Sequence, residues 1–300
     1  MNNERNLLLA RARNDYDPAL VIIDETILGS IAWPSSASSP MKLNIHGEKG
    51  VDAPSALAFL VAMSSINYRF WKLSPEGHLT RYHYADKTGA RALWMAFESA
   101  WGHEEASPSR FIRRFQDEGF HALFGDMPGE KERIAILSEV LAGDSLQSLC
   151  VSMSESVLYS SEVCVEHARQ LASAFPMAFG DPYLKKAQLA LSLFAAYLRV
   201  LSGNIGASDL TAFADYQVPR VLRALGILQY SDQFAKNVDS LQIIAQGSPE
   251  EKAVRAATIL ACEEIAKVVG GTAADVDNLL WQSQDIAGDW AFHLTDTTWY

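Results

Sequence analysis

The chain has 300 residues, with 25 lysines and arginines against 36 aspartates and glutamates, so its formal net charge is −11. Hydrophobic residues make up 49% and charged residues 20%, a composition typical of globular proteins that excludes a disordered or fibrous chain. The acidic balance argues against a nucleic-acid surface binder, because such proteins need a basic face to neutralise phosphates. A small phosphorylated ligand remains compatible, since one local basic pocket would hold it.

In the first half of the chain, Asp17-Pro18 predicts the start of a helix, because Asp caps free N–H groups and Pro suits the first turn. The Ser-rich stretch 34–40 predicts a loop, and Asp52-Ala-Pro predicts a second helix through Ile66. Residues 78–84 are polar and aromatic and predict a short strand. Further helices are predicted over 90–101, 107–117 and 131–141.

In the second half, helices are predicted over 161–174, 181–201, 218–225, 231–237 and 250–269. The range 181–201 has the clearest signals, because Asp181 can cap it and Pro182 suits its first position. Apolar residues recur at a period near 3.6 throughout, with little strand-like alternation. We therefore predict a mainly α fold with at most a small β element, forming a single domain over 1–300.

The cysteine content and the apolar runs indicate the compartment. Cys150, Cys164 and Cys262 are too few and too scattered for a disulfide framework, which favours a reducing cytoplasm. The start of the chain lacks the apolar core of a secretory signal. The longest apolar runs, Ala56–Met63 and Leu189–Leu198, are shorter than the ~20 residues that span a bilayer. We therefore expect a cytoplasmic protein that is not membrane-embedded.

Common catalytic motifs are absent from the sequence, including glycine-rich phosphate loops and zinc-protease motifs. Cys164-Val-Glu-His167 places a thiol and an imidazole on one helix face. Two ligands cannot close a tetrahedral zinc site, so we favour a structural role for this pair.

Two carboxylate positions are more informative. Glu263 follows an apolar run on the 250–269 helix, on roughly the same side as Arg255. A buried carboxylate needs partners, so Glu263 forms either a structural ion pair or a ligand contact. Asp215 lies between Phe213 and Tyr216, just before a predicted helix. It is either an ordinary cap or an ionised carboxylate stabilised by that helix N-terminus.

Five segments in order carry a family resemblance: Ile66–Trp71, Ala174–Gln188, Phe213–Asp232, Val254–Glu263 and Leu280–Tyr300. The most distinctive is FADYQVPRVLRALGILQYSD, which begins at Phe213. Together they resemble the queuosine salvage family of queuosine 5′-phosphate N-glycosylases (hydrolases), most clearly over 52–300.

The resemblance implies a monomeric helical fold related to helix-hairpin-helix DNA glycosylases. It implies hydrolysis of the N-glycosidic bond of queuosine 5′-monophosphate, which releases queuine and ribose 5-phosphate for queuine salvage. The implied partner is therefore a small nucleotide rather than intact nucleic acid or a membrane, and no metal or organic cofactor is implied.

The same resemblance, together with the local setting, implies roles for particular side chains. Asp215 is the predicted catalytic carboxylate, which would stabilise positive charge at C1′, activate water or attack directly. The predicted substrate-binding residues are Phe70, Trp71, Phe213 and Tyr216 for stacking on the base, Asn67 and Glu263 for hydrogen bonds to it, Lys185 and Lys186 for the 5′-phosphate, His293 for the phosphate or sugar, and Arg255 and Trp281.

Two positions depart from the family pattern, which has Arg where this chain has Gln217 and Asp296. Either Lys186, Arg220 and Arg69 compensate, or the ligand is less anionic. Three alternatives therefore stay open: a glycosylase for the free nucleoside or for another 7-deazapurine nucleotide, a non-catalytic deazapurine-binding protein, and a DNA glycosylase. The last is disfavoured by the net charge of −11.

Overall fold

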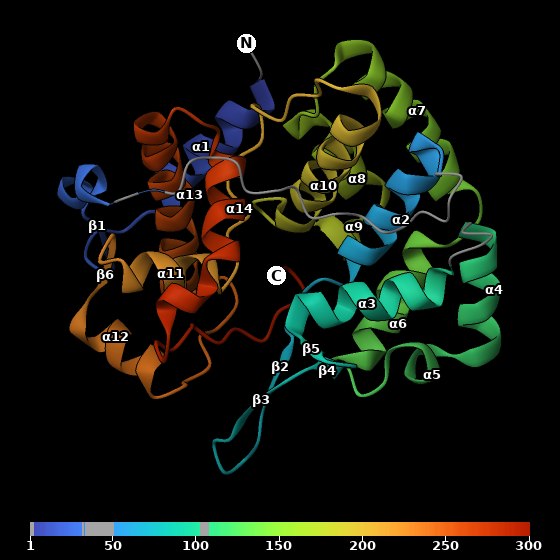
Figure 1. The fold of residues 1–300 in the computed structure, drawn as a ribbon. Coiled ribbons are helices and arrows are strands. Elements are labelled where there is room, and N and C mark those ends of the chain that lie inside the picture. The colour runs from blue at the N-terminus through green and yellow to red at the C-terminus, as the bar shows by residue number, and fades with distance from the viewer. Residues whose placement is uncertain (1–2, 32, 34–50, 103–107) are drawn as a thin grey trace.

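The structure, a computed structural model, describes residues 3–31, 33, 51–102 and 108–300. Helices form two lobes side by side, and the C-terminal end of the chain lies between them (Figure 1). The prediction of a mainly α fold with a small β element is confirmed. The β structure in the described ranges consists of the antiparallel strand pairs β1–β6, β2–β3 and β4–β5.

The first lobe contains the middle of the chain. Its helices are α2 (Ala53–Ser65), α3 (Gly89–Trp101), α4 (Pro108–Glu118), α5 (Phe120–Phe124), α6 (Glu130–Val140), α7 (Ser145–Ser160), α8 (Val165–Ala174), α9 (Pro176–Phe179) and α10 (Lys185–Ser202), and its strands are β2 (Trp71–Leu73), β3 (Leu79–Arg81), β4 (His83–Tyr84) and β5 (Lys87–Thr88). In the strand pairs, Trp71 lies opposite Arg81 and His83 opposite Thr88.

The second lobe combines both ends of the chain. Its helices are α1 (Asn3–Asp15), α11 (Val218–Ala224), α12 (Asp232–Asp239), α13 (Pro249–Val269) and α14 (Ala273–Gln282), with short 3-10 helices η1 (Glu25–Ser30) and η2 (Gln284–Ala287) and the paired strands β1 (Val21–Ile23) and β6 (Leu228–Tyr230). Val21 lies opposite Tyr230 in this pair.

Each lobe contains a central helix whose residues are mostly buried. In the first lobe, α2 packs between α7 and α10, and every residue from Ala56 to Ser65 is buried. Asp52 caps this helix, since its carboxylate accepts the N–H of Ser55 at 2.7 Å. In the second lobe, α13 packs against α1 and α14 and ends at Gly270, whose φ of 71° suits glycine.

Most predicted helices are confirmed, and the predicted strand over 78–84 is present as β3 and β4. The helix predicted from Asp17 is wrong: the chain forms a turn there, then β1 and η1. Pairing with β6, more than 200 residues away, decides that structure, and no local pattern shows it. The sequence analysis also missed β6 and the helices α1, α7 and α14.

Two predicted helix starts are too early. The helix predicted over 161–174 begins at Val165. The helix predicted from Asp181 begins at Lys185, because Leu184 has a left-handed φ of 55°. The predicted loop over 34–40 and the first residue of the 107–117 helix lie outside the described residues.

The thiol and imidazole singled out in the sequence have a structural role. Sγ of Cys164 lies 3.2 Å from Nδ1 of His167, in a capping box at the start of α8. Nε2 of His167 lies 3.2 Å from the Ser156 hydroxyl. Both groups therefore have local partners, which supports the structural interpretation.

None of the described helices is, on its own, both long and apolar enough to cross a membrane, although α6 and α7, bent by 66° at their junction, meet the length and composition criteria together.

Candidate functional site

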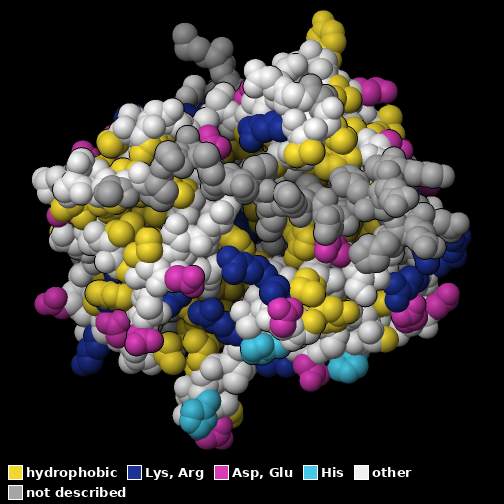
Figure 2. All heavy atoms as spheres, viewed as in Figure 1, with side chains coloured by type: hydrophobic (Ala, Val, Ile, Leu, Met, Phe, Trp, Pro, Cys, Tyr) yellow, Lys and Arg dark blue, Asp and Glu magenta, His cyan; other side chains and the backbone are white. Residues whose placement is uncertain are grey.

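A cluster of apolar side chains lies where the two lobes meet. Trp71 of β2 packs there with Tyr216, Phe292, Leu294 and Tyr300. The ring centroids of Tyr216 and Phe292 are 4.8 Å apart. Figure 2 shows that this face of the molecule is hollowed between the lobes, with Lys and Arg side chains beside the hollow. The junction therefore offers flat apolar surfaces and positive charge together.

Asp215 lies in this junction, in the segment that leads into α11. Its side chain is buried, and Oδ1 accepts the N–H groups of Gln217 at 2.7 Å and Val218 at 3.1 Å. These backbone donors fix the carboxylate and stabilise negative charge on it. Oδ2 has no hydrogen bond to any other described residue, so one oxygen is left for a ligand.

Asp277, on α14, is a second buried carboxyl group at the junction, and the sequence analysis missed it. Its Oδ2 accepts the N–H of Phe213 at 2.8 Å. Burial, and then the charge of Asp215, raise the pKa of Asp277 to about 8. The sequence pattern that could have revealed Asp277 is an acidic residue on the apolar face that Val276 and Leu280 form on this helix.

Lys185 supplies a positive charge near both carboxyl groups. It begins α10, and its own N–H donates to Oδ2 of Asp181 at 2.8 Å. The side chain is buried, and burial lowers the pKa of its ammonium, while the charges of Asp215 and Asp277 oppose that change. No hydrogen bond joins this ammonium to another described residue, so it is available to an anionic ligand.

Lys186 is placed differently from its neighbour. Its Nζ donates to the carbonyl of Ser65 at 2.6 Å and lies 4.8 Å from the ring centroid of Tyr68. Burial, with the nearby charges of Lys185 and Arg133, holds its pKa well below the usual value. The predicted phosphate contact would have to replace the bond to Ser65.

Arg255 stabilises the backbone immediately before Asp215. Its guanidinium is fully buried and pairs with both oxygens of Asp181, at 2.8 and 2.7 Å. Its Nε donates to the carbonyl of Ala214 at 3.1 Å. Although burial disfavours the charge, the carboxylates of Asp181 and Glu251 raise the pKa of Arg255. This geometry indicates a supporting role rather than direct contact with a ligand.

The structural ion pair considered for Glu263 is present, but its partner is not Arg255. Glu263 pairs instead with Arg5 of α1, at 2.7 Å. Eight helical residues separate Arg255 from Glu263, which is about 12 Å along the axis. The partner of Glu263 is therefore supplied by α1, which the sequence analysis missed.

The four predicted stacking residues divide into two pairs. Phe70 and Phe213 belong to the core of the first lobe, whereas Trp71 and Tyr216 belong to the junction cluster. Trp71 and Tyr216 pack in the same apolar cluster, so this segment and the segment of Asp215 are in contact. Asn67, at the start of the first segment, is buried with 8% of its surface exposed.

His293 and Trp281 are also near the lobe boundary. Nε2 of His293 lies 3.4 Å from the Tyr300 hydroxyl, and Nδ1 is buried without a partner. Burial, and then the charge of Arg255, lower the pKa of His293 to about 3, so its contact with a ligand at neutral pH would be that of a neutral donor or acceptor. Trp281 lies under Arg91 of α3, 5.5 Å from ring centroid to guanidinium.

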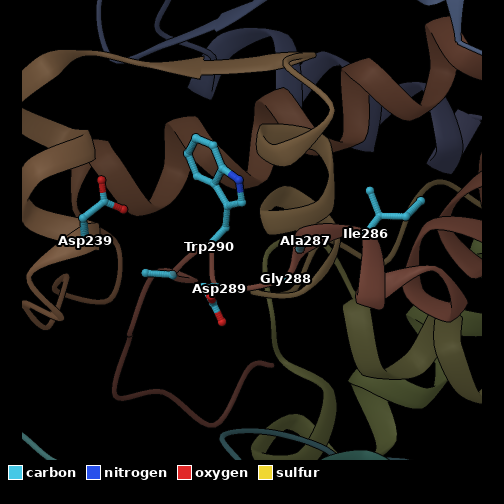
Figure 3. Close-up of a pocket in the computed structure, with 7 residues that line it drawn as sticks. Asp239, Ile286, Ala287, Gly288, Asp289 and Trp290 are labelled. Atoms are coloured by element: carbon cyan, nitrogen blue, oxygen red, sulfur yellow. The ribbon is translucent and has the colours of Figure 1, made fainter.

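A surface pocket of about 570 Å³ lies elsewhere on the second lobe, lined by Asp239 and residues 286–291. Figure 3 shows Trp290 projecting beside Asp239 there. None of the predicted site residues lines it. Among the described residues, no three His, Cys, Asp or Glu side chains are grouped so that they could hold a metal ion.

Comparison with known proteins decides the family. The sequence model described as "queuosine salvage protein" matches residues 46–300. This chain belongs to the queuosine salvage protein family.

Several relatives of this chain are named queuosine 5′-phosphate N-glycosylase/hydrolase. The one from Sphaerobacter thermophilus is 32% identical over 83% of each chain. The one from Dictyostelium discoideum is 22% identical over 83% of this chain and 79% of its own. The one from Mus musculus is 26% identical over 72% of this chain and 69% of its own.

The cations that were expected to compensate for Gln217 and Asp296 already have partners. Arg69 forms an ion pair with Asp296. Arg220 donates to the carbonyls of Gly288 and of Trp290. Lys186, as described above, donates to a carbonyl. Of the cations considered, Lys185 is therefore the best placed to bind an anionic group directly.

Proposed function

We propose that this chain is an N-glycosidase that hydrolyses queuosine 5′-monophosphate to queuine and ribose 5-phosphate. The names of the relatives support this substrate. The observation that carries the proposal is the buried Asp215 carboxylate, fixed through Oδ1 and free at Oδ2, beside aromatic rings and the unpaired Lys185 ammonium. These groups match the needs of glycosidic cleavage in a nucleotide.

Asp215 acts on the sugar. As the bond between C1′ and the base nitrogen breaks, its electrons go to the base, and positive charge develops on the sugar. A fixed carboxylate stabilises that charge. Water then supplies the oxygen that bonds to C1′, and its protons go to the products. Asp215 either orients this water or first bonds to C1′ itself.

The base is the demanding leaving group. A 7-deazapurine has carbon in place of N7, so the usual site of purine protonation is absent. Trp71 and Tyr216 offer rings for stacking at the junction. Asp277, with a pKa of about 8, holds a proton at neutral pH and can donate a hydrogen bond. Its contact with Phe213 places that neutral carboxyl group beside the segment of Asp215.

The free nucleoside, queuosine, is the second candidate substrate. It is favoured by one observation: Arg69, Arg220 and Lys186 are each engaged by protein atoms, which leaves Lys185 as the main phosphate ligand. The expectations of a monomer, of a cytoplasmic location and of activity without a cofactor remain predictions.

The decisive experiment measures release of free base from queuosine 5′-monophosphate, queuosine and damaged DNA. We expect release from the nucleotide, and Asp215→Asn should lower the rate by about 10²–10⁴-fold, because it removes the catalytic charge. Asp232→Asn, at an exposed position of α12, is the control and should leave the rate unchanged. Undiminished turnover by Asp215→Asn would remove Asp215 from the mechanism. Binding of queuine without any turnover would instead support a non-catalytic binding protein.

Lys185→Ala tests the phosphate contact. It should raise KM for the 5′-phosphate about tenfold or more and change KM for queuosine much less, because only the nucleotide carries the anionic group. Lys252→Ala, at an exposed position of α13, is the matched control. An equal effect on both substrates would place Lys185 away from the phosphate.

A further inference from the structure

Arg69 is fixed at the junction by its backbone. It has a left-handed φ of 34°, a conformation that residues other than glycine adopt rarely. Its N–H donates to the carbonyl of Tyr300 at 3.0 Å, and its carbonyl accepts from Arg133 at 3.4 Å. Trp71, two residues further on, packs with Tyr216 and Tyr300 in the junction cluster. The guanidinium of Arg69 therefore projects from a segment held directly against the segment of Asp215.

The partner of this guanidinium is Asp296, in the C-terminal segment. Asp296 follows Thr295, which is buried with His293, but its own side chain is 62% exposed, whereas that of Arg69 is 16% exposed. Of the described cations Arg69, Arg133 and Lys186, only Arg69 has a carboxylate in an ion pair. The other two contact carbonyls and rings.

An exposed carboxylate of this kind adds little to the stability of the fold, since such pairs contribute about 0–1 kcal/mol. Its electrostatic effect on a ligand is larger, because it neutralises one cation of the junction and repels an incoming anion. A phosphate group beside Arg69 would therefore compete with Asp296 for the same guanidinium.

We propose that Asp296 is a specificity-determining residue: it occupies Arg69 in place of a ligand's anionic group and so weakens the preference for a 5′-phosphorylated nucleoside over the free nucleoside. This inference rests on the proposed function for the identity of the two substrates. It concerns selectivity between them, and the chemistry at C1′ is unaffected.

The test is a double-mutant cycle of Asp296→Asn and Arg69→Gln. The quantity measured is the ratio of kcat/KM for queuosine 5′-monophosphate to kcat/KM for queuosine. Asp296→Asn should raise this ratio about tenfold, the effect of one nearby charge on a bound anion. In the Arg69→Gln background the same change should raise it less than twofold, because no guanidinium is released. Asp86→Asn, which breaks a similarly exposed ion pair with Lys87, is the control.

The inference would be overturned if the ratio of kcat/KM values for Asp296→Asn equalled that for Asp86→Asn. It would also be overturned if Asp296→Asn raised this ratio equally in the presence and in the absence of Arg69. A second measurement does not need turnover: the rise in melting temperature caused by inorganic phosphate. It should be larger for Asp296→Asn than for the unaltered protein, and this gain should vanish when Arg69→Gln is added. If neither queuosine 5′-monophosphate nor queuosine is cleaved, the proposed function fails. The measurement with inorganic phosphate then still decides the inference.

Discussion

Arg255 and Arg133 are both fully buried, one in each lobe. Carboxylates surround the guanidinium of Arg255, whereas carbonyls and an aromatic ring surround that of Arg133. Arg255 pairs with both oxygens of Asp181 and lies 3.4 Å from Glu251. Arg133 donates to backbone carbonyls and lies 4.0 Å from the ring centroid of Tyr68. No carboxylate in the described part of the chain pairs with Arg133.

The two environments have opposite effects on the pKa of the guanidinium that each encloses. The carboxylates raise the pKa of Arg255 despite its burial, whereas burial lowers the pKa of Arg133 to about 10. Both groups are charged at neutral pH, but only Arg255 is neutralised locally. Burying a charge without a counter-ion is costly, so Arg133 should contribute less to the stability of the fold than Arg255.

Removing the counter-ion of Arg255 should have the largest effect. Asp181→Asn leaves a buried guanidinium without its two-pronged partner, and we expect a loss of about 3–5 kcal/mol in the free energy of unfolding. Urea titration followed by circular dichroism measures it. Asp86→Asn, which breaks the exposed pair with Lys87, is the control and should cost about 1 kcal/mol or less. Equal losses in the free energy of unfolding would show that the buried pair of Arg255 and Asp181 contributes no more to stability than the control pair.

Asp277 is a buried acid that forms no ion pair with another described residue. Its contribution to the stability of the fold should therefore fall as pH rises. The pKa of Asp277 is raised from its ordinary value of 3.8 to about 8, so the folded protein keeps a proton that the unfolded chain releases between these values. Its contribution to stability is therefore full below pH 3.8 and is lost as pH rises towards 8.

The isosteric variant Asp277→Asn removes this titration. Unaltered protein should lose about 2 kcal/mol or more relative to Asp277→Asn between pH 5 and pH 8, measured by urea unfolding at each pH. A difference between the two proteins that stays constant across this range would contradict the assignment of a raised pKa.

Removing the uncompensated guanidinium should have the smallest effect on stability. Arg133→Met deletes a buried charge and leaves three carbonyls without this donor, so the opposing effects should leave a net loss of about 1–2 kcal/mol. Arg113→Met, at an exposed position of α4, is the control. A loss as large as that of Asp181→Asn would show that Arg133 is a structural residue and would remove the contrast between the two guanidinium groups.

Local signals in the sequence predicted α2 and α13 well. Asp52 and Ser248 cap α2 and α13 as their residue types suggest, and Gly270 ends α13. Elements that depend on distant partners could not be predicted in this way. The β1–β6 pair joins segments from opposite ends of the chain, and a three-residue strand has too few residues for a recognisable pattern.

The residues of the candidate site also divide into those that local sequence signals reveal and those that depend on distant partners. Asp215 could be selected from the sequence, because a carboxylate between aromatic rings and a helix start is a conspicuous arrangement and the family resemblance covers it. Asp277 was missed because its significance comes from Phe213 and Lys185, which reach it only in the folded chain. Glu263 was selected as a carboxylate interrupting an apolar helix, but its partner, Arg5, lies 258 residues away.

Helix α1 is a mechanical link between the lobes. Its adjacent residues Leu8 and Leu9 are buried in different cores, the first in that of the first lobe and the second in that of the second. Glu4 likewise pairs with Arg169 of α8, while Arg5 pairs across to α13. A hinge motion that parted the lobes would pull one of these leucines into water. We therefore expect ligand entry through side-chain and loop movement between lobes of fixed spacing, and Leu8→Ala/Leu9→Ala should widen the distribution of lobe distances seen by spin labels.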